Sequence, residues 1–165
     1  MMKDQFIEQQ GIYLLSHSVG LPQKTAKSAA DLGFWQPWMA GNEKIWDHWL
    51  GEIERFRGQL GRLLNSDASH FCPQTTISSA VNKIIFSLTP ETHKNIILMS
   101  EEDFPSVAYA LQQSKTLGYH MRYIPAGLNL NDLDVWNQYL SDDVALVLVT
   151  QVQSNNGVQL PIEAI

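Results

Sequence analysis

The second half of the sequence alternates short apolar segments with amphipathic ones, and this alternation limits the folds open to the chain. Three apolar runs read as strands, at residues 95–100, 119–124 and 144–150. The first and last runs are apolar enough to be buried on both faces. Three helices are predicted around them, over residues 77–88, 105–117 and 131–140. Because strands separated by helices need crossover connections, the predicted fold class is α/β, a three-layer, mostly parallel sheet with flanking helices.

The first 64 residues follow a different pattern and predict an N-terminal helical arm. Residues 11–20 begin as a short strand, residues 21–31 fit a short helix, and the aromatic segment 33–42 reads as an irregular loop. From Asn42, a plausible N-cap, apolar residues recur at helical spacing to about Leu64. We therefore divide the chain into residues 1–64, an arm with helices, and residues 65–165, the α/β part.

Composition excludes several classes of function. With 165 residues, of which 44% are hydrophobic, the chain can form an ordinary globular core, and its net charge of −6 argues against binding nucleic acid or anionic membranes. The single cysteine, Cys72, cannot form an internal disulfide, and no segment has the pattern of an export signal or a membrane span, so we expect a cytoplasmic protein. The histidines show no paired spacing suited to a metal.

Ligands of parallel sheets bind beyond the carboxyl ends of the strands, which directs attention to the turns. Thr75 and Thr76 precede the first α/β helix, whose first amides have no partner within the helix. A hydroxyl there can cap the helix, or it can hold a phosphate together with the exposed N–H groups and the positive end of the helix dipole. Both interpretations remain open for these two threonines.

The turn after the first strand carries an aromatic residue in an unusual place. If Pro105 is the first helical residue, Phe104 lies at or next to the N-cap, where it offers no capping oxygen. Its ring could stack on a flat heteroaromatic ligand; alternatively it forms a hydrophobic staple or a core contact and Ser106 is the cap. The acidic residues before it, Glu101 to Asp103, could supply a general base, although a solvated turn is the simpler interpretation.

The turn after the last strand gathers amides and a hydroxyl. Gln151, Gln153, Ser154 and the two asparagines that follow offer donors and acceptors, and Gly157 can supply a positive φ. A plain polar turn would account for these residues too. Together, the three turns would provide a phosphate cradle, a stacking ring and hydrogen bonds to a ring substituent.

The segments "PQTTISSAVNKII", "EEDFPSVAYAL" and "ALVLVTQVQSNNGVQLPI", in this order, resemble the cofactor-binding half of class V aminotransferase-like, pyridoxal-phosphate-dependent enzymes of fold type I, above all the kynureninase-like ones. "YLLSHSVGLPQ" resembles the short entry motif of that group. The resemblance implies that residues 65–165 are the first part of a large domain that binds pyridoxal 5'-phosphate (PLP). It also implies that Thr75 and Thr76 bind the phosphate, that Phe104 stacks on the pyridine ring and that Ser154 faces the cofactor.

Two positions depart from the family pattern. Val107 stands where kynureninase has an aspartate, which places the hydrolysis of kynurenine in doubt, and Ser154 replaces the Asn or Tyr of several relatives. The family's pyridine-pairing aspartate and Schiff-base lysine both follow the third turn, whereas every lysine of this chain precedes it. We therefore expect a truncated form of a longer enzyme, without activity of its own and with no catalytic residue assigned here.

Two functions follow as hypotheses. The first is the PLP-binding part of an enzyme that acts on an amino acid and forms a homodimer, with the tryptophans at 35, 38, 46 and 49 as a possible partner surface. Core packing is the simpler role for Trp46 and Trp49. The second is a non-catalytic α/β module that binds a phosphorylated small molecule or a partner chain.

Overall fold

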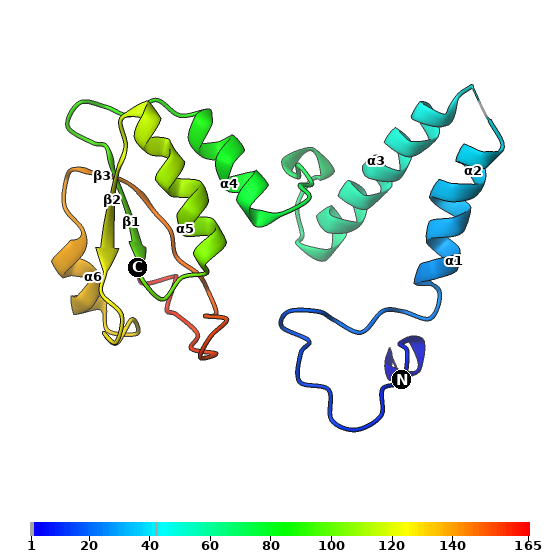
Figure 1. The fold of residues 1–165 in the computed structure, drawn as a ribbon, viewed down its shortest axis with the longest axis horizontal. Helices are drawn as coiled ribbons and strands as arrows, with labels where there is room; N and C mark the ends of the chain where they lie inside the picture. Colours follow the sequence, from blue (N-terminus) through cyan, green and yellow to red (C-terminus); the bar gives the residue numbers. More distant parts are fainter. Residues whose placement is uncertain (1, 42) are drawn as a thin grey trace. The chain divides into compact units, whose positions relative to one another are not determined.

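The computed structural model describes residues 2–41 and 43–165, which form two compact units, residues 1–73 and 74–165 (Figure 1). The second unit contains a three-stranded parallel sheet with the strand order β2-β1-β3. Its strands are β1 (Ile96–Ser100), β2 (His120–Ile124) and β3 (Val144–Val147). The three strands were all predicted from the apolar runs, and the α/β fold class is confirmed.

Helices cover both faces of this sheet. α4 (Ile77–Phe86) and α5 (Pro105–Gln112) pack on one face, and α6 (Leu133–Tyr139) lies on the other (Figure 1). Because successive side chains of a strand point to opposite faces, β1 contributes to two cores. Ile97 and Met99 pack with the α4–α5 side, and Leu98 packs with the α6 side.

The strands differ in burial. β1 is central and buried along almost its whole length, as predicted. β3 is shorter than predicted and lies at an edge of the three-stranded sheet, and its Val147 is 38% exposed. The prediction that this strand is buried on both faces is therefore wrong. An apolar run can predict a strand, but it cannot tell whether both faces of that strand will be covered.

Gly118, the residue expected to end the second helix of the α/β part, does so. A 3-10 turn, Gln113–Leu117, follows α5, and Gly118 ends it with a φ of 98°. That left-handed conformation is open to glycine without a steric penalty. The peptide N–H of Gly118 donates to the carbonyl of Lys115, which closes the turn that leads into β2.

The first unit is helical and differs from the prediction in two segments, residues 33–39 and residues 11–20. α1 (Ala26–Ala30) continues through a π-helical stretch, Asp31–Trp35, into α2 (Gln36–Met39), so the expected loop over residues 33–42 is wrong up to residue 39. Pro37 lies at the start of α2, directly after the π-helical stretch, where the hydrogen-bond pattern changes. No strand forms over residues 11–20 of the described chain.

α3 (Ile45–Leu63) is the long predicted helix and ends one residue before the expected position. Its N-cap is Lys44, and the expected cap Asn42 lies outside the described residues. Trp46 is 68% exposed, so the expected core packing of this side chain is wrong. Trp49 is half-buried and stacks on Phe34 with ring centroids 4.9 Å apart.

Candidate functional site

The strand order of the second unit identifies the edge at which a ligand should bind. The chain runs from β1 through α5 to β2 and then returns through α6 to β3, on the other side of β1. α5 and α6 pack on opposite faces, so the winding direction reverses between β1 and β3. In open parallel sheets, ligands bind outside the carboxyl ends of the strands at such a reversal. The turns after β1 and β3 are therefore the first candidates.

Thr75 and Thr76 are both exposed at the amino end of α4. Thr76 is the N-cap: its backbone is extended, and its Oγ1 accepts a hydrogen bond of 3.0 Å from the N–H of Ser79. The capping interpretation is thus correct for Thr76. A cap satisfies one amide of the first turn, whereas a helix begins with four amides that lack a partner within it. Capping and anion binding are therefore compatible at this helix end.

Phe104 is the N-cap residue of α5, directly before Pro105, and its side chain makes no capping hydrogen bond. The prediction of its position is confirmed, and the alternative in which Ser106 caps the helix is wrong. The ring is 57% exposed, so the alternative of a core contact is wrong as well. An exposed aromatic ring at a helix cap adds little to folding, which leaves it open to stacking on a flat molecule.

The amino ends of α4 and α5 lie next to each other. The hydroxyl of Ser78, in the first turn of α4, donates to the carbonyl of Ser106, in the first turn of α5, over 3.3 Å. Thr76 and Phe104 each lie two residues before one of these serines. The structure therefore brings the threonine pair and the phenyl ring into the same region, as a ligand with an anionic group and a flat ring requires.

The turn after β3 is tightly hydrogen-bonded. Gly157 has a φ of 72°, as predicted, and its N–H donates to the carbonyl of Gln153 over 2.9 Å. The N–H of Gln153 donates in turn to the carbonyl of Val158, also over 2.9 Å. Ser154 is exposed in this turn, directly after the buried Gln153. Gln153 therefore anchors the turn, and Ser154 is presented to solvent.

Asp103 is the residue that the sequence interpretation missed. It is only 5% exposed, so the solvated turn expected for it is wrong. Its Oδ1 accepts hydrogen bonds from the Thr150 hydroxyl at 2.6 Å and from the Gln153 side-chain amide at 3.3 Å. Its Oδ2 accepts from the N–H of Ser100 at 3.0 Å. The carboxylate thus joins the turns after β1 and β3, the two strands that flank the reversal.

The other two acidic residues of the run join β1 to its other neighbour. Glu101 accepts from the N–H of Ala126 at 3.0 Å, and Glu102 accepts from the N–H of Gly127 at 3.2 Å. Both amides belong to the turn after β2. Glu101 is exposed and Glu102 is half-buried, so the solvated interpretation holds better for these two residues than for Asp103. The whole acidic run therefore holds the turns at the carboxyl edge of the sheet.

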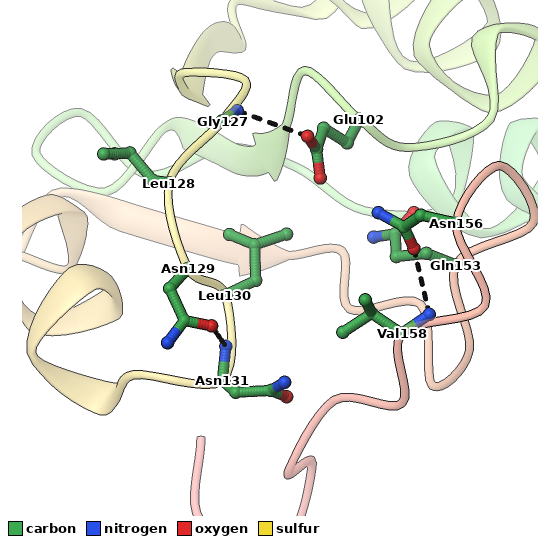
Figure 2. A pocket seen from close by; sticks show the side chains of 9 residues that line it. All are labelled: Glu102, Gly127, Leu128, Asn129, Leu130, Asn131, Gln153, Asn156 and Val158. Carbon is green, nitrogen blue, oxygen red and sulfur yellow. Dashed lines mark hydrogen bonds between the residues drawn. The ribbon is translucent and has the colours of Figure 1, made fainter.

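A cavity of about 240 Å³ opens at the same edge of the sheet (Figure 2). The turns after all three strands contribute lining residues, among them Glu102, Gly127, Asn129, Leu130, Gln153 and Asn156. None of Thr75, Thr76, Phe104 and Ser154 lines it. Leu130 belongs to the core on the α6 side, whereas Val107 of α5 belongs to the core on the other face. The cavity is thus separate from the four residues expected to bind the cofactor, although three other candidates from the turns, Glu102, Gln153 and Asn156, line it.

Positive charge near the threonine pair comes from Lys83. This residue lies on α4, and its Nζ donates to Oε1 of Gln74 over 2.5 Å. Gln74 directly precedes Thr75, so the ammonium group is held near the amino end of the helix. Its charge adds to the positive end of the helix dipole, and both favour an anion there.

Within residues 2–41 and 43–165, no three or more His, Cys, Asp or Glu side chains gather as a metal site would require. In the same described part of the chain, no helix is both long and apolar enough to cross a membrane.

Comparisons with known proteins provide a structural likeness and no sequence relative. No protein-family model matches the sequence, and no curated protein is significantly similar to it. Among solved structures, the chain is similar to a lysine-to-alanine mutant of C-DES with glycine covalently linked to the PLP cofactor, with a TM-score of 0.76 and 19% identity over 88% of this chain. It is also similar to the cystine C-S lyase C-DES in complex with its reaction product cysteine persulfide, with a TM-score of 0.76, 18% identity and the same coverage.

The chain spans 39% and 40% of the two C-DES chains that it matches. At this level of identity the likeness concerns the fold. The sheet, its flanking helices and the similarity to C-DES confirm the fold predicted from the sequence. The chain thus shares the fold of part of C-DES.

Proposed function

We propose that this chain is the cofactor-binding portion of a PLP-dependent enzyme that acts on an amino acid, of the class V aminotransferase-like and kynureninase-like group. The observation that carries the proposal is the exposed amino end of α4 beside the exposed ring of Phe104, next to the reversal in the sheet. The fold shared with C-DES, which has a PLP cofactor, supports it. PLP itself fits the set of groups present.

The threonine pair is proposed to hold the phosphate. The first-turn amides of α4 and the positive end of its dipole attract an anion, and the hydroxyls of Thr75 and Thr76 add donors. Both threonines are exposed, so no rearrangement of the core is needed for a phosphate to approach. Lys83 places an ammonium group near the same helix end.

The ring of Phe104 is proposed to stack on the pyridine of PLP, and Ser154 is proposed to face the cofactor. Offset stacking of two aromatic rings contributes about 0.5–1.5 kcal/mol beyond the area that it buries. The backbone of Phe104 is fixed as the N-cap of α5, so its ring starts from a defined position. Bound PLP supplies an electron sink for chemistry at an amino group, and the role proposed for this chain is to bind and orient it.

The substrate class, assembly and location remain predictions. An amino acid is the expected substrate, and a homodimer is the expected assembly. Large apolar side chains on α3 support the latter because they are exposed in this chain, including Trp46, Leu50, Ile53 and Phe56. A cytoplasmic location is still expected from the single cysteine. The expected absence of turnover by this chain alone also stays a prediction.

The test is a binding experiment on the 165-residue chain with 4'-deoxypyridoxine 5'-phosphate, which has the ring and phosphate of PLP but no aldehyde. We expect it to bind and to shift the amide NMR signals of residues 75–79 and 104. Pyridoxine, which lacks the phosphate, should bind more weakly. Phe104→Ala should weaken binding of the ring compound, whereas Phe104→Tyr, which keeps an aromatic ring, should retain it. Failure of the wild-type chain to bind would contradict the proposal.

A second measurement separates an enzyme portion from a simple binding module. PLP is added, the absorbance of an imine is recorded, and borohydride reduction is followed by mass mapping of any modified lysine. We expect binding without a unique modified lysine. One uniquely modified lysine would contradict the expected absence of the Schiff-base residue. Equal affinity for unrelated phosphorylated molecules would instead favour the non-catalytic α/β module.

A further inference from the structure

We propose that Asp103 is a positioning residue that clamps the turns after β1 and β3 together and thereby orients the ring site. This inference rests on the proposed function and deepens it. Asp103 directly precedes Phe104, the residue proposed to stack on the cofactor ring. Its partners Thr150 and Gln153 are distant in the sequence, by 47 and 50 residues. The carboxylate is therefore a direct link between the two sides of the reversal in the sheet.

The three hydrogen bonds of Asp103 match the accepting capacity of a carboxylate. The peptide N–H of Ser100, the hydroxyl of Thr150 and the amide of Gln153 all donate to it. An ionised carboxylate only accepts, so all three bonds can form at once. An asparagine would turn an NH₂ group toward at least one of these donors. Hydrogen bonds to a charged group are stronger than those between neutral groups, which makes this clamp stronger than a neutral one.

The clamp also sets the direction of the Gln153 side chain. Its Nε2 donates to Asp103, so its Oε1 is left for other partners. Gln153 is 2% exposed and lines the cavity in Figure 2. Its backbone holds the turn that presents Ser154, through bonds with Val158 and Gly157. Asp103 thus fixes Phe104 on one side and the turn of Ser154 on the other, while the phosphate site at α4 lies outside the clamp.

This geometry predicts a selective effect on ligand binding. Without the clamp, the ring of a bound molecule loses its fixed surroundings, but a free anion at the amino end of α4 keeps its partners. Asp103→Asn should therefore weaken binding of 4'-deoxypyridoxine 5'-phosphate by about tenfold, the effect of losing one charge-assisted hydrogen bond. Inorganic phosphate should bind with an affinity within about twofold of the wild type, as expected for an independent site. The induced circular dichroism of the bound ring should fall as well.

The experiment compares four versions of the 165-residue chain: wild type, Asp103→Asn, Thr150→Val and Glu101→Gln. Glu101→Gln is the matched control, because it makes the same charge change on the same turn and alters a bond to Ala126 instead. Thr150→Val removes one donor to Asp103 without touching the carboxylate, so it keeps the test valid if Asp103→Asn fails to fold. Thr150→Val should weaken binding of the ring compound, but less than Asp103→Asn does. Glu101→Gln should bind the ring compound with the affinity of the wild type.

Amide hydrogen exchange of the ligand-free chain separates failure of this inference from failure of the proposed function. The Ser100 amide should exchange faster in Asp103→Asn than in wild type and in Glu101→Gln. If the wild type binds the ring compound and both Asp103→Asn and Thr150→Val bind it equally well, the inference is wrong and the proposed function stands. If the wild type binds nothing, the proposed function fails, and unchanged exchange at Ser100 would then overturn the clamp too. Parallel losses of ring and phosphate affinity would also overturn it, since they indicate a general structural defect.

Discussion

The two units of this chain have similar apolar patterns and very different interiors. The second unit holds all the buried hydrophobic side chains found in the described residues, and β1 is covered on both faces by helices. In the described part of the first unit the only buried residue is Gly61, although α3 carries a regular apolar face. Periodicity therefore decides which segments become helices. A core forms only where a second layer covers the apolar face.

The aromatic cluster of the first unit shows how incomplete that cover is. Phe34, Trp35, Trp38 and Trp49 contact one another at ring distances of 4.9–5.9 Å. Most of these rings are still exposed, and the buried indole N–H of Trp49 has no hydrogen-bond partner among the described residues. A buried donor without a partner costs free energy. The exposed rings fit the proposed homodimer, in which another copy would cover this surface.

The largest expected difference between the units concerns two tryptophans. Trp136 of α6 is 1% exposed, and its indole N–H donates to the carbonyl of Leu130 over 2.9 Å. Trp136→Ala should lower the free energy of unfolding by about 3–5 kcal/mol, because it leaves a cavity in a closed core. Trp46→Ala, at an exposed position, should change it by about 0.5 kcal/mol or less. Urea denaturation of the two variants under dilute conditions checks this, and similar losses would break the comparison.

Two glycines of α3 test whether the first unit has any tight packing of its own. A Cβ on Gly61 would lie 2.7 Å from the carbonyl oxygen of Ser66 and 3.3 Å from the backbone nitrogen of Ala68. Gly61→Ala should therefore destabilise the helix end by about 1–3 kcal/mol, as overpacking does. Gly58 has no atom within 4 Å of a Cβ, so Gly58→Ala should stabilise α3 by up to about 1 kcal/mol. Hydrogen exchange of the α3 amides distinguishes the two, and equal effects would show that Gly61 is not packed.

The threonine pair separates stability from binding in the second unit. Thr76→Val removes the cap of α4 and should cost about 1 kcal/mol of stability, whereas Thr76→Asn keeps a capping oxygen and should cost little. Thr75→Val, at an exposed residue, should change stability by less than about 0.5 kcal/mol. Both valine variants should weaken phosphate binding. Thermal unfolding measures the stability of each variant, and titration with phosphate measures its affinity. Full phosphate affinity in Thr75→Val would contradict the proposed role of Thr75.

The smallest expected effect is a dependence of stability on acid. Arg122 of β2 forms two hydrogen bonds with Asp143, of 3.1 and 2.7 Å, and together with the Ser141 hydroxyl it lowers the pKa of that carboxyl. Because the pKa of Asp143 is lower in the folded chain, its carboxylate adds to the free energy of unfolding. This contribution is complete above the unfolded pKa of 3.8 and is lost as the pH falls through the lower folded value. Asp143→Asn should abolish this part of the acid dependence. The pair is partly exposed, so the effect is small.

The same measurement has a counterpart in the first unit. The Ser69 hydroxyl and backbone N–H lower the pKa of Asp67, which is the N-cap of the short 3-10 turn Ala68–His70. Like Asp143, Asp67 therefore adds to the free energy of unfolding, and this contribution is lost as the pH falls below 3.8. Between pH 2 and pH 6, Asp67→Asn should change the unfolding midpoint of the first unit and leave that of the second unit unchanged. A response of both units to one substitution would show that they unfold together.

Local patterns were enough to predict much of the second unit. β1 was expected over residues 95–100 and spans Ile96–Ser100, and Phe104 was expected at the cap that it occupies. Gly118 and Gly157 adopt the positive φ values that their places in the sequence suggested. These features depend on neighbours within a few residues: on the apolar run that forms a strand, on the proline that follows the cap, and on the positive φ that glycine adopts easily. The candidate residues Thr75, Thr76, Phe104 and Ser154 came from the same local signals and from the family resemblance, and their roles stay predictions.

The remaining features depended on contacts that no local pattern contains. Residues 33–39 became helical although their aromatic and proline content suggested a loop, because the rings pack against α3. In the sequence, Asp103 is one of three consecutive acidic residues that were expected to be solvated. It is buried because Thr150 and Gln153, which are 47 and 50 residues away, donate hydrogen bonds to it. The sequence by itself determined which segments of the second unit become strands, helices and turns, because those choices are short-range. The tertiary structure alone decided which apolar faces are covered and which carboxylate is enclosed, because burial requires partners from distant parts of the chain.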